Sequence, residues 1–212
     1  MSRDAEDKEE IPWLTYGGGQ LPSDEDLDQV RETLARGELI IFPTDTVYGV
    51  AADERVEGAE ARLFVAKQRP ADRMIPRLVA GMDQVIAHGA EVSNAAMKLA
   101  EKYWPGALTL VLPHPHFGSI GYRVPDHPVA RAVLSAVDYP LLVTSANQSG
   151  APETGTAGDA FNALAASVAM VLDGGPATSM VPSSVVGLAG ETPEIFREGP
   201  ISSDDIFEIL RG

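Results

Sequence analysis

Small hydroxyl and amide side chains stand beside three apolar segments of this 212-residue chain. They are Thr44, Thr46, Thr144, Ser145, Asn147 and Ser183. In α/β sheets ligands are held at the carboxyl ends of strands, because the loops there present side chains and free backbone N–H groups. The same residue types are also common in ordinary turns and helix caps. Two of the three clusters follow an apolar segment, so a ligand site and simple turn chemistry both stay open.

Four cationic residues support the interpretation that these side chains bind a ligand. Lys67 and Arg69 lie where Pro70 stops an amphipathic helix, so both can project from one rigid corner toward an anion such as a phosphate chain. The helix dipole also favours cations at this end, which is the simpler explanation. Arg123 lies inside a strand-like segment and Arg197 follows another, and a charge buried in a strand rarely lacks a partner. Cations and hydroxyls together predict a pocket for a carboxylate plus a polyphosphate.

Several other chemistries lack the residues they need. The chain has no cysteine, which excludes disulfides, thiolate metal sites and thiol nucleophiles. His114 and His116 flank a proline, and such a pair without a third ligand is more typical of a surface loop than of a metal site. We expect no metal held by the protein alone. The motifs G-x-x-x-x-G-K-[ST], G-x-G-x-x-G and G-x-S-x-G are all missing, so any ATP site must be built differently.

Composition narrows the class of protein further. The chain is 44% hydrophobic and 22% charged, as in ordinary globular domains, and no run approaches the roughly 20 apolar residues of a membrane span. Residues 1–7 are acidic and polar, unlike a secretory signal, so we expect a cytoplasmic protein without a membrane partner. The formal net charge of −15 argues against non-specific binding of nucleic acid.

Strand and helix patterns interleave with short connections, which predicts an α/β or α+β fold around one sheet. The expected helices cover 23–37, 58–67, 92–103, 129–137, 159–166 and 204–210, and the expected strands cover 39–42, 108–112, 122–124, 141–144, 169–172, 184–188 and 194–196. Residues 1–22 contain three consecutive glycines and two prolines, so we expect a flexible acidic arm there. A single domain is expected over residues 23–212.

Six motifs occur in a fixed order along the chain. They read PTDTVYGV (43–50), KQRP (67–70), YWPGALT (103–109), RVPDHP (123–128), TSANQSG (144–150) and FREGP (196–200). In order and spacing they resemble the YrdC-like family of threonylcarbamoyl-AMP synthases, from about residue 25 to 210. The resemblance implies a twisted mixed sheet with flanking helices and a concave ligand cavity.

The resemblance also implies an activity. Members of this family are nucleotidyltransferases that join L-threonine, bicarbonate and ATP, with Mg²⁺ on the nucleotide, into threonylcarbamoyl-AMP and pyrophosphate. A partner enzyme then transfers the threonylcarbamoyl group to tRNA. By this resemblance the threonine would be bordered by Thr44, Arg123, Thr144 and Ser183. The nucleotide would be held by Lys67, Arg69, Ser119, Ser145, Asn147 and Arg197, with Lys67 and Arg69 as the catalytic cations.

Three departures from the family pattern keep an alternative open. Residues 71–79 are longer than usual and lack a histidine often found there, and the last motif pair reads Ser183-Ser184. The chain also ends at Gly212, so we expect no additional C-terminal domain of the kind that longer members carry. The alternative is a catalytically altered YrdC-like protein that binds RNA or acts as a regulator. Weak RNA binding along the concave face stays open, as does activation of a different carbamate on the same scaffold.

Overall fold

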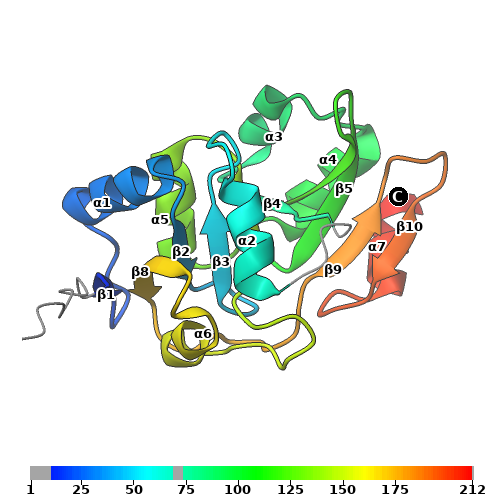
Figure 1. Cartoon of the computed structure of the whole chain (residues 1–212). Helices are drawn as coiled ribbons and strands as arrows, with labels where there is room; N and C mark the ends of the chain where they lie inside the picture. Colours follow the sequence, from blue (N-terminus) through cyan, green and yellow to red (C-terminus); the bar gives the residue numbers. More distant parts are fainter. Residues whose placement is uncertain (1–10, 69–73, 212) are drawn as a thin grey trace, which may run out of the picture.

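The computed structural model describes residues 11–68 and 74–211, which form one ten-stranded sheet with helices packed on it (Figure 1). The strands are β1 (Trp13–Thr15), β2 (Leu39–Phe42), β3 (Gly49–Ala52), β4 (Arg77–Leu78), β5 (Leu108–His114), β6 (Gly118–Arg123), β7 (Leu141–Ser145), β8 (Val168–Asp173), β9 (Ser184–Gly187) and β10 (Glu194–Arg197). The helices are α1 (Asp24–Ala35), α2 (Ala59–Lys67), α3 (Met82–His88), α4 (Asn94–Tyr103), α5 (Pro128–Val137), α6 (Ala157–Leu164) and α7 (Ser203–Arg211).

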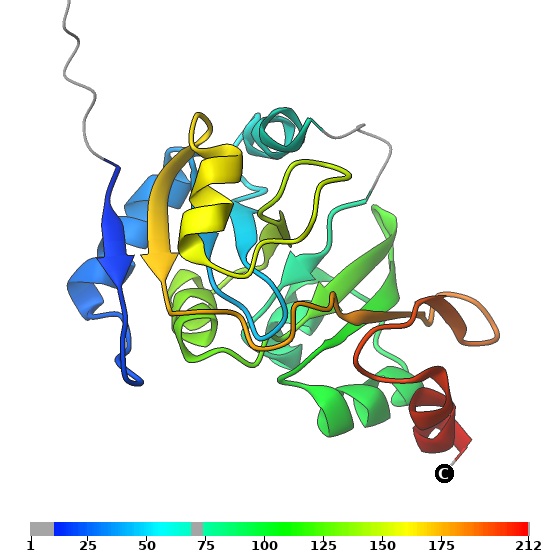
Figure 2. The same cartoon turned by 90° about the horizontal axis from the view of Figure 1, so that it is seen from below.

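The sheet is mixed, and its order is β1-β8-β2-β3-β7-β4-β6-β5-β9-β10. Strand β8 runs parallel to β1 and β2, whereas β3 and β7 run antiparallel to their neighbours in the middle of the sheet. One edge carries β1 beside β8, and α7 lies at the opposite end of the molecule (Figure 2). The predicted α/β class with a mixed sheet is therefore confirmed.

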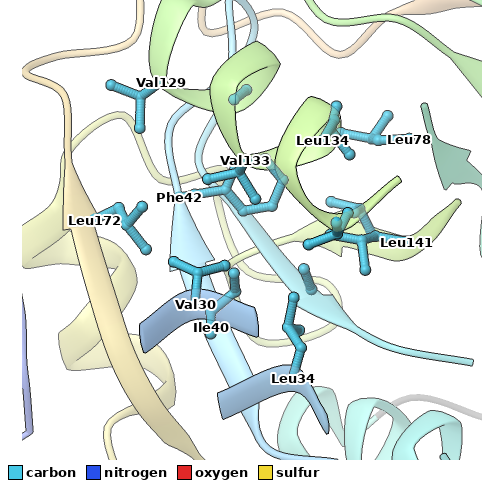
Figure 3. Packing of buried hydrophobic residues seen from close by; sticks show 14 of the residues in the cluster. Val30, Leu34, Ile40, Phe42, Leu78, Val129, Val133, Leu134, Leu141 and Leu172 are labelled. Carbon is cyan, nitrogen blue, oxygen red and sulfur yellow. The ribbon is translucent and has the colours of Figure 1, made fainter. Parts of the chain in front are cut away.

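Strand β2 shows why the sequence of this region is continuously apolar. Ile40 and Phe42 pack against α1 and α5 on one face of the sheet (Figure 3). Leu39 and Ile41 point to the other face and pack against α2 and α6. Successive strand side chains alternate between faces, so a strand covered by helices on both sides must be apolar at every position. This predicted strand is confirmed.

The other half of the sheet is covered differently. Leu108, Leu110 and Leu112 of β5 point into a core shared with α3, α4 and α7. Thr109 and Val111 alternate with them and therefore face the opposite side, where they line a cavity. The half-sheet formed by β5, β6 and β9 thus has one face in the core and one face that a ligand can reach.

The prediction of a flexible arm over residues 1–22 is wrong at residues 13–16. Residues Trp13–Thr15 form β1 in parallel register with β8, and the Tyr16 side chain is buried in the core. Three residues are too few to show the alternating pattern of a strand in the sequence. The strand is stabilised by main-chain hydrogen bonds to β8. The part of the arm in residues 1–10 lies outside the described residues.

Local signals located several elements correctly. Ser23 forms a capping box with Asp26 at the start of α1, and His127 caps α5. Strands β3 and β4 are absent from the prediction, because each is short and lacks a long apolar period. Within the described ranges, none of the helices has the length and apolar character needed to cross a membrane.

Candidate active site

The cavity on the open face of the sheet has a volume of about 880 Å³. Nine of the predicted site residues line it: Thr44, Lys67, Ser119, Arg123, Thr144, Ser145, Asn147, Ser183 and Arg197. They come from segments that are far apart in the sequence and that the sheet order brings together. The tenth predicted residue, Arg69, lies outside the described residues.

One polar corner of the cavity is built around Lys67, the last residue of α2. Its buried ammonium donates hydrogen bonds to the backbone oxygens of Ser145 and Asn147 and to Asn147 Oδ1, the latter two at 2.8 and 3.0 Å. Ser145 Oγ donates to Asn147 Oδ1 at 2.6 Å, and Asn147 Nδ2 donates to the Ala151 oxygen at 2.7 Å. These bonds hold a positive charge in a fixed position beside the end of β7, as phosphate binding requires.

A second cation, Arg123, is fixed at the end of β6. Its Nη2 donates to Asp45 Oδ1 at 2.6 Å, its Nη1 to Thr46 Oγ1 at 2.8 Å and its Nε to the Gly106 oxygen at 2.8 Å. Burial lowers the pKa of the guanidinium, and the nearby carboxylate of Asp45 acts in the opposite direction. The guanidinium remains charged because arginine does not deprotonate in proteins. The prediction that this strand charge must have a partner is confirmed.

A third polar group lies around the start of β9, which stands between β5 and β10 in the sheet. Thr109 Oγ1 and Ser183 Oγ are 2.8 Å apart, and Arg197 Nε donates to the Ser183 oxygen at 2.8 Å. Arg197 Nη2 also approaches Ser183 Oγ at 3.3 Å. Partial burial lowers the pKa of the Arg197 guanidinium, and the carboxylate of Glu153 opposes this change. The second half of the cavity wall therefore carries its own fixed cation and hydroxyl.

The small hydroxyl residues serve the fold as well as the cavity. Thr44 Oγ1 donates to the Val47 oxygen at 2.6 Å and accepts from the backbone N–H groups of Thr46 and Val47 at 3.2 Å. Thr44 thus performs turn chemistry and lines the cavity at the same time, and its part in binding a ligand stays a prediction. Ser119 reaches the cavity from β6 and Thr144 from β7.

Two acidic residues belong to the site although the sequence did not single them out. Asp45 binds Arg123 and also accepts a hydrogen bond from the Asp126 backbone N–H at 3.0 Å. Glu153 lines the cavity, and its buried Oε2 atom has no hydrogen-bond partner. The motif around residue 45 was a signal for Asp45. Glu153 lies in a loop with no signal of its own.

The histidines are used in the fold, outside the cavity. His114 Nε2 lies 3.0 Å from the His88 backbone oxygen. The ring of His88 lies between Glu54 Oε1, at 2.9 Å, and the Tyr122 hydroxyl, at 2.6 Å. Among residues 11–68 and 74–211, no three His, Cys, Asp or Glu side chains are grouped so that they could hold a metal ion.

Comparison with known proteins identifies the family. The family described as Telomere recombination (Sua5_yciO_yrdC) matches residues 32–199. The chain belongs to this family. The resemblance inferred from the six motifs is thereby confirmed, since the matched range includes most of their length.

Individual relatives are similar over most of the chain. A Mycobacterium tuberculosis protein provisionally named threonylcarbamoyl-AMP synthase is 38% identical over 184 residues, which are 82% of this chain and 84% of that protein. The threonylcarbamoyl-AMP synthase of Xanthomonas campestris is 34% identical over 82% of this chain and 94% of its own length. The enzyme of that name from Bacillus subtilis is 31% identical over 89% of this chain and 57% of its own length.

Solved structures show the same fold. Pyrococcus abyssi Sua5 complexed with L-threonine has a TM-score of 0.86 at 28% identity over 94% of this chain. This chain spans 60% of the length of that Sua5 chain. Escherichia coli YciO has a TM-score of 0.78 at 25% identity, over 90% of this chain and 96% of that one.

Proposed function

We propose that this chain makes threonylcarbamoyl-AMP and pyrophosphate from L-threonine, bicarbonate and ATP. The observation that carries the proposal is the single cavity in which three fixed cations, Lys67, Arg123 and Arg197, meet a set of hydroxyl groups. The names of the relatives support the reaction, and the similar Sua5 structure complexed with L-threonine supports that substrate.

The threonine would lie near Arg123, whose guanidinium would pair with its carboxylate. Thr44, Thr144 and Ser183 would border the amino acid and accept or donate hydrogen bonds to its polar groups. Asp45 and Thr46 hold the guanidinium through two of its nitrogens, so its orientation is set before the substrate arrives. A preorganised cation of this kind spends little free energy on reorganisation when the ligand binds.

The nucleotide would extend along the remaining wall. Lys67, Ser145 and Asn147 would contact phosphate oxygens at one end, with Ser119 and Arg197 contributing from β6 and β10. Arg69 stays a prediction for the same phosphate group. Cations that neutralise the phosphates lower the barrier to attack, because negative charge accumulates in the transition state of phosphoryl transfer.

The reaction would proceed in two steps. The threonine amine adds to bicarbonate with loss of water and forms a carbamate. A carbamate oxygen then attacks the α-phosphorus of ATP, a new oxygen–phosphorus bond forms, and the bond to the bridging oxygen breaks so that pyrophosphate leaves. No side chain has to act as a nucleophile in this scheme, which agrees with the absence of cysteine. The main work of the cavity is to hold the reactants in line.

Magnesium would accompany the ATP, and the cavity offers a suitable donor. Mg²⁺ usually binds one or two carboxylates together with substrate phosphates and water. Glu153 is the acidic residue among the described side chains that line the cavity, and its Oε2 atom is buried without a hydrogen-bond partner. Bound magnesium would neutralise phosphate charge. Glu153 would hold the ion at the cavity wall, and its carboxylate also acts on the nearby Arg197 guanidinium, whose pKa it raises.

The chemical reactivity of the product indicates which other macromolecules take part. A threonylcarbamoyl-adenylate is a reactive mixed anhydride, so we propose that a transferase consumes it and modifies tRNA. We place the reaction in the cytoplasm, where ATP and tRNA are both available. The net charge of −15 gives no support to direct binding of RNA by this chain.

The test is pyrophosphate release by the purified protein with ATP and magnesium, omitting L-threonine and bicarbonate in turn. We expect release only when both are present, together with a short-lived product of the adenylate mass. Serine replaces threonine as a control for the side-chain methyl group. Release that does not depend on threonine, or no release at all, would refute the proposed function.

A further inference from the structure

Strand β4 is the place where two halves of the sheet meet. It pairs on one side with β7, in the half formed by β1, β8, β2, β3 and β7, and on the other side with β6, in the half formed by β6, β5, β9 and β10. Ile75 and Leu78 pack in the cores of the first half, and Val79 packs in the core of the second. Within the sheet, the relative position of the halves depends on a strand of only two residues.

The cavity spans this join. Lys67 and Asn147 line it from α2 and from the end of β7 in the first half, whereas Arg123 and Arg197 line it from β6 and β10 in the second. Under the proposed function the triphosphate would lie at Lys67 and the threonine carboxylate at Arg123. The main ion-pairing groups of the two reactants are therefore in different halves, and their separation depends on how the halves are held.

Arg77 is a charged residue in the middle of the sheet, and it points away from the cavity. Leu78 and its register partner Arg123 line the cavity. Successive side chains alternate between the faces of a strand, so Arg77 and its register partner Tyr122 point to the other face. Apolar residues in place of a buried ion pair often stabilise a protein as well or better. Stability alone therefore does not explain a charge at this position.

The partner of Arg77 is Glu54, which lies in the loop between β3 and α2 of the first half. Arg77 Nε and Nη2 both donate to Glu54 Oε2, at 3.1 and 2.6 Å, and Nη1 donates to the Ile75 oxygen at 2.9 Å. The side chains of Arg77 and Glu54 are only 8% and 16% exposed. Salt screens a buried pair much less than an exposed one, so this contact is strong and fixed in direction.

The same carboxylate reaches the second half through His88, the last residue of α3. Glu54 Oε1 lies 2.9 Å from His88 Nε2, and His88 Nδ1 lies 2.6 Å from the Tyr122 hydroxyl on β6. The Arg77 guanidinium also lies 5.6 Å from the ring centroid of Phe117, in the turn between β5 and β6. The β3–α2 loop, α3 and this turn lie at the same end of the sheet (Figure 1). We call Glu54, Arg77, His88 and Tyr122 the Arg77 cluster.

Ion pairs thus cross the join on both faces of the sheet. On the cavity side, Asp45 follows β2 in the first half and binds Arg123 on β6 in the second. On the opposite side, the Arg77 cluster connects a loop of the first half to the same strand β6. Hinge motions occur where a few residues join two packed bodies. Contacts on both faces of β4 oppose such a motion.

We propose that Arg77 is a positioning residue which, through Glu54 and His88, holds the two halves of the cavity at the separation that the reaction needs. This inference rests on the proposed function for the identity of the reactants. The carbamate oxygen has to lie in line with the α-phosphorus, and a misplacement of about 1 Å can reduce a rate roughly 100-fold. Arg77 acts only through the placement of the groups that contact the reactants.

The first experiment compares kcat with the dissociation constants of ATP, measured with magnesium and without threonine, and of L-threonine, measured alone. The variant Arg77→Met keeps much of the aliphatic stem and removes the guanidinium. We expect kcat to fall roughly 10- to 100-fold and each dissociation constant to change less than about threefold, because the main ion-pairing group of each reactant stays intact within its own half. The stoichiometry of ATP binding counts the folded molecules. Arg77→Lys, which keeps the charge beside Glu54, should show the same split on a smaller scale and replaces Arg77→Met if that variant does not fold.

Arg55→Met is the matched control, because Arg55 lies in the same loop as Glu54 and makes the same kinds of contact within one half. Its Nη2 binds Asp53 Oδ2 at 2.8 Å, and its guanidinium lies 3.2 Å from the ring centroid of Tyr139. Asp53 follows β3, and Tyr139 packs against the core of the first half, so this pair does not cross the join. Arg55→Met should leave kcat and both dissociation constants nearly unchanged.

A distance measurement tests the position of the halves independently of activity. The chain has no cysteine, so Glu32→Cys on α1 and Met97→Cys on α4 provide two unique positions for nitroxide labels. Both positions are exposed, and the two helices pack on different halves (Figure 1). Electron paramagnetic resonance then gives the distribution of distances between the labels. We expect a wider or shifted distribution in Arg77→Met and an unchanged one in Arg55→Met.

Two results would overturn the inference. One is a lower melting temperature of Arg77→Met with kcat unchanged in the folded protein, which would leave Arg77 a purely structural role. The other is a label distribution that Arg77→Met does not alter. If the unchanged protein releases no threonine-dependent pyrophosphate, the proposed function fails, and the label distribution alone then supports or overturns the role of Arg77 in holding the halves.

Discussion

Replacing Asp45 by asparagine tests whether one buried ion pair both stabilises the fold and orients the threonine site. Asp45 and Arg123 approach to 2.6 Å, and their side chains are only 15% and 7% exposed. Removing one partner of a buried pair costs about 3–5 kcal/mol, because the other charge stays buried without compensation. Arg123 keeps its hydrogen bonds to Thr46 and Gly106, which places the expected loss near the lower limit, at about 3 kcal/mol.

The assay is unfolding by heat and by urea. For a chain of this length each kcal/mol shifts the melting temperature by about 2–4 °C, so Asp45→Asn should melt about 6–12 °C lower. The control is Asp28→Asn, which breaks the exposed pair of Asp28 with Arg31 on α1. Exposed pairs contribute about 0.2–1 kcal/mol, so this variant should melt within a few degrees of the unchanged protein.

The kinetic effect of Asp45→Asn distinguishes a role of Asp45 in orienting the threonine site from its role in stabilising the fold. Below the melting temperature, Asp45→Asn should raise the Michaelis constant for threonine and leave that for ATP nearly unchanged. The double variant Asp45→Asn with Arg123→Gln should be less destabilised than the sum of the two single variants, by at least about 1 kcal/mol. Equal melting shifts for Asp45→Asn and Asp28→Asn, or strict additivity in the double variant, would refute the reasoning.

Three further predictions concern the other charged groups. Lys67→Ala should reduce kcat/KM for ATP about 100-fold or more in steady-state kinetics. Lys67→Arg should not restore the activity, because a planar guanidinium does not fit the carbonyl oxygens of residues 145 and 147 that the ammonium binds. Glu153→Gln should raise the half-saturating magnesium concentration roughly tenfold or more, and an unchanged magnesium titration would exclude Glu153 as a ligand. Burial lowers the pKa of His88 from 6.5, so the unfolded chain binds more protons and the free energy of unfolding should fall as pH drops below about 6.5. Urea titrations at about pH 7.5 and 5.5 should show a smaller fall in His88→Gln than in the unchanged protein; an equal fall would count against this origin.

The chemistry of the site could be predicted from residue types beside apolar segments. Lys67, Arg123 and Ser183 were singled out because cations and hydroxyls at strand or helix ends suit an anionic ligand, and all three line one cavity. Local sequence carries this information because a helix stop or a strand end is determined by a few adjacent residues. The same holds for Ser23, whose capping box lies within four residues.

Short elements could not be predicted. β1 and β4 contain three and two residues, and neither is long enough for an alternating pattern to be distinguished from a loop. β1 exists because β8 supplies hydrogen-bond partners from the far end of the chain. The expectation of an arm that is flexible throughout residues 1–22 was wrong at this strand for that reason.

By itself the sequence determined that Arg123 needs a partner, that the cavity is cationic and that the chain has the motifs of its family. The tertiary structure alone decided that the partner is Asp45, which is 78 positions away, and that Phe196 stands in a bulge facing the cavity. This is because the tendency of a residue to be buried and its need for hydrogen-bond partners follow from its type and from its neighbours in the sequence. Partner choice and side-chain direction depend on the order and register of strands, which join segments distant in the chain.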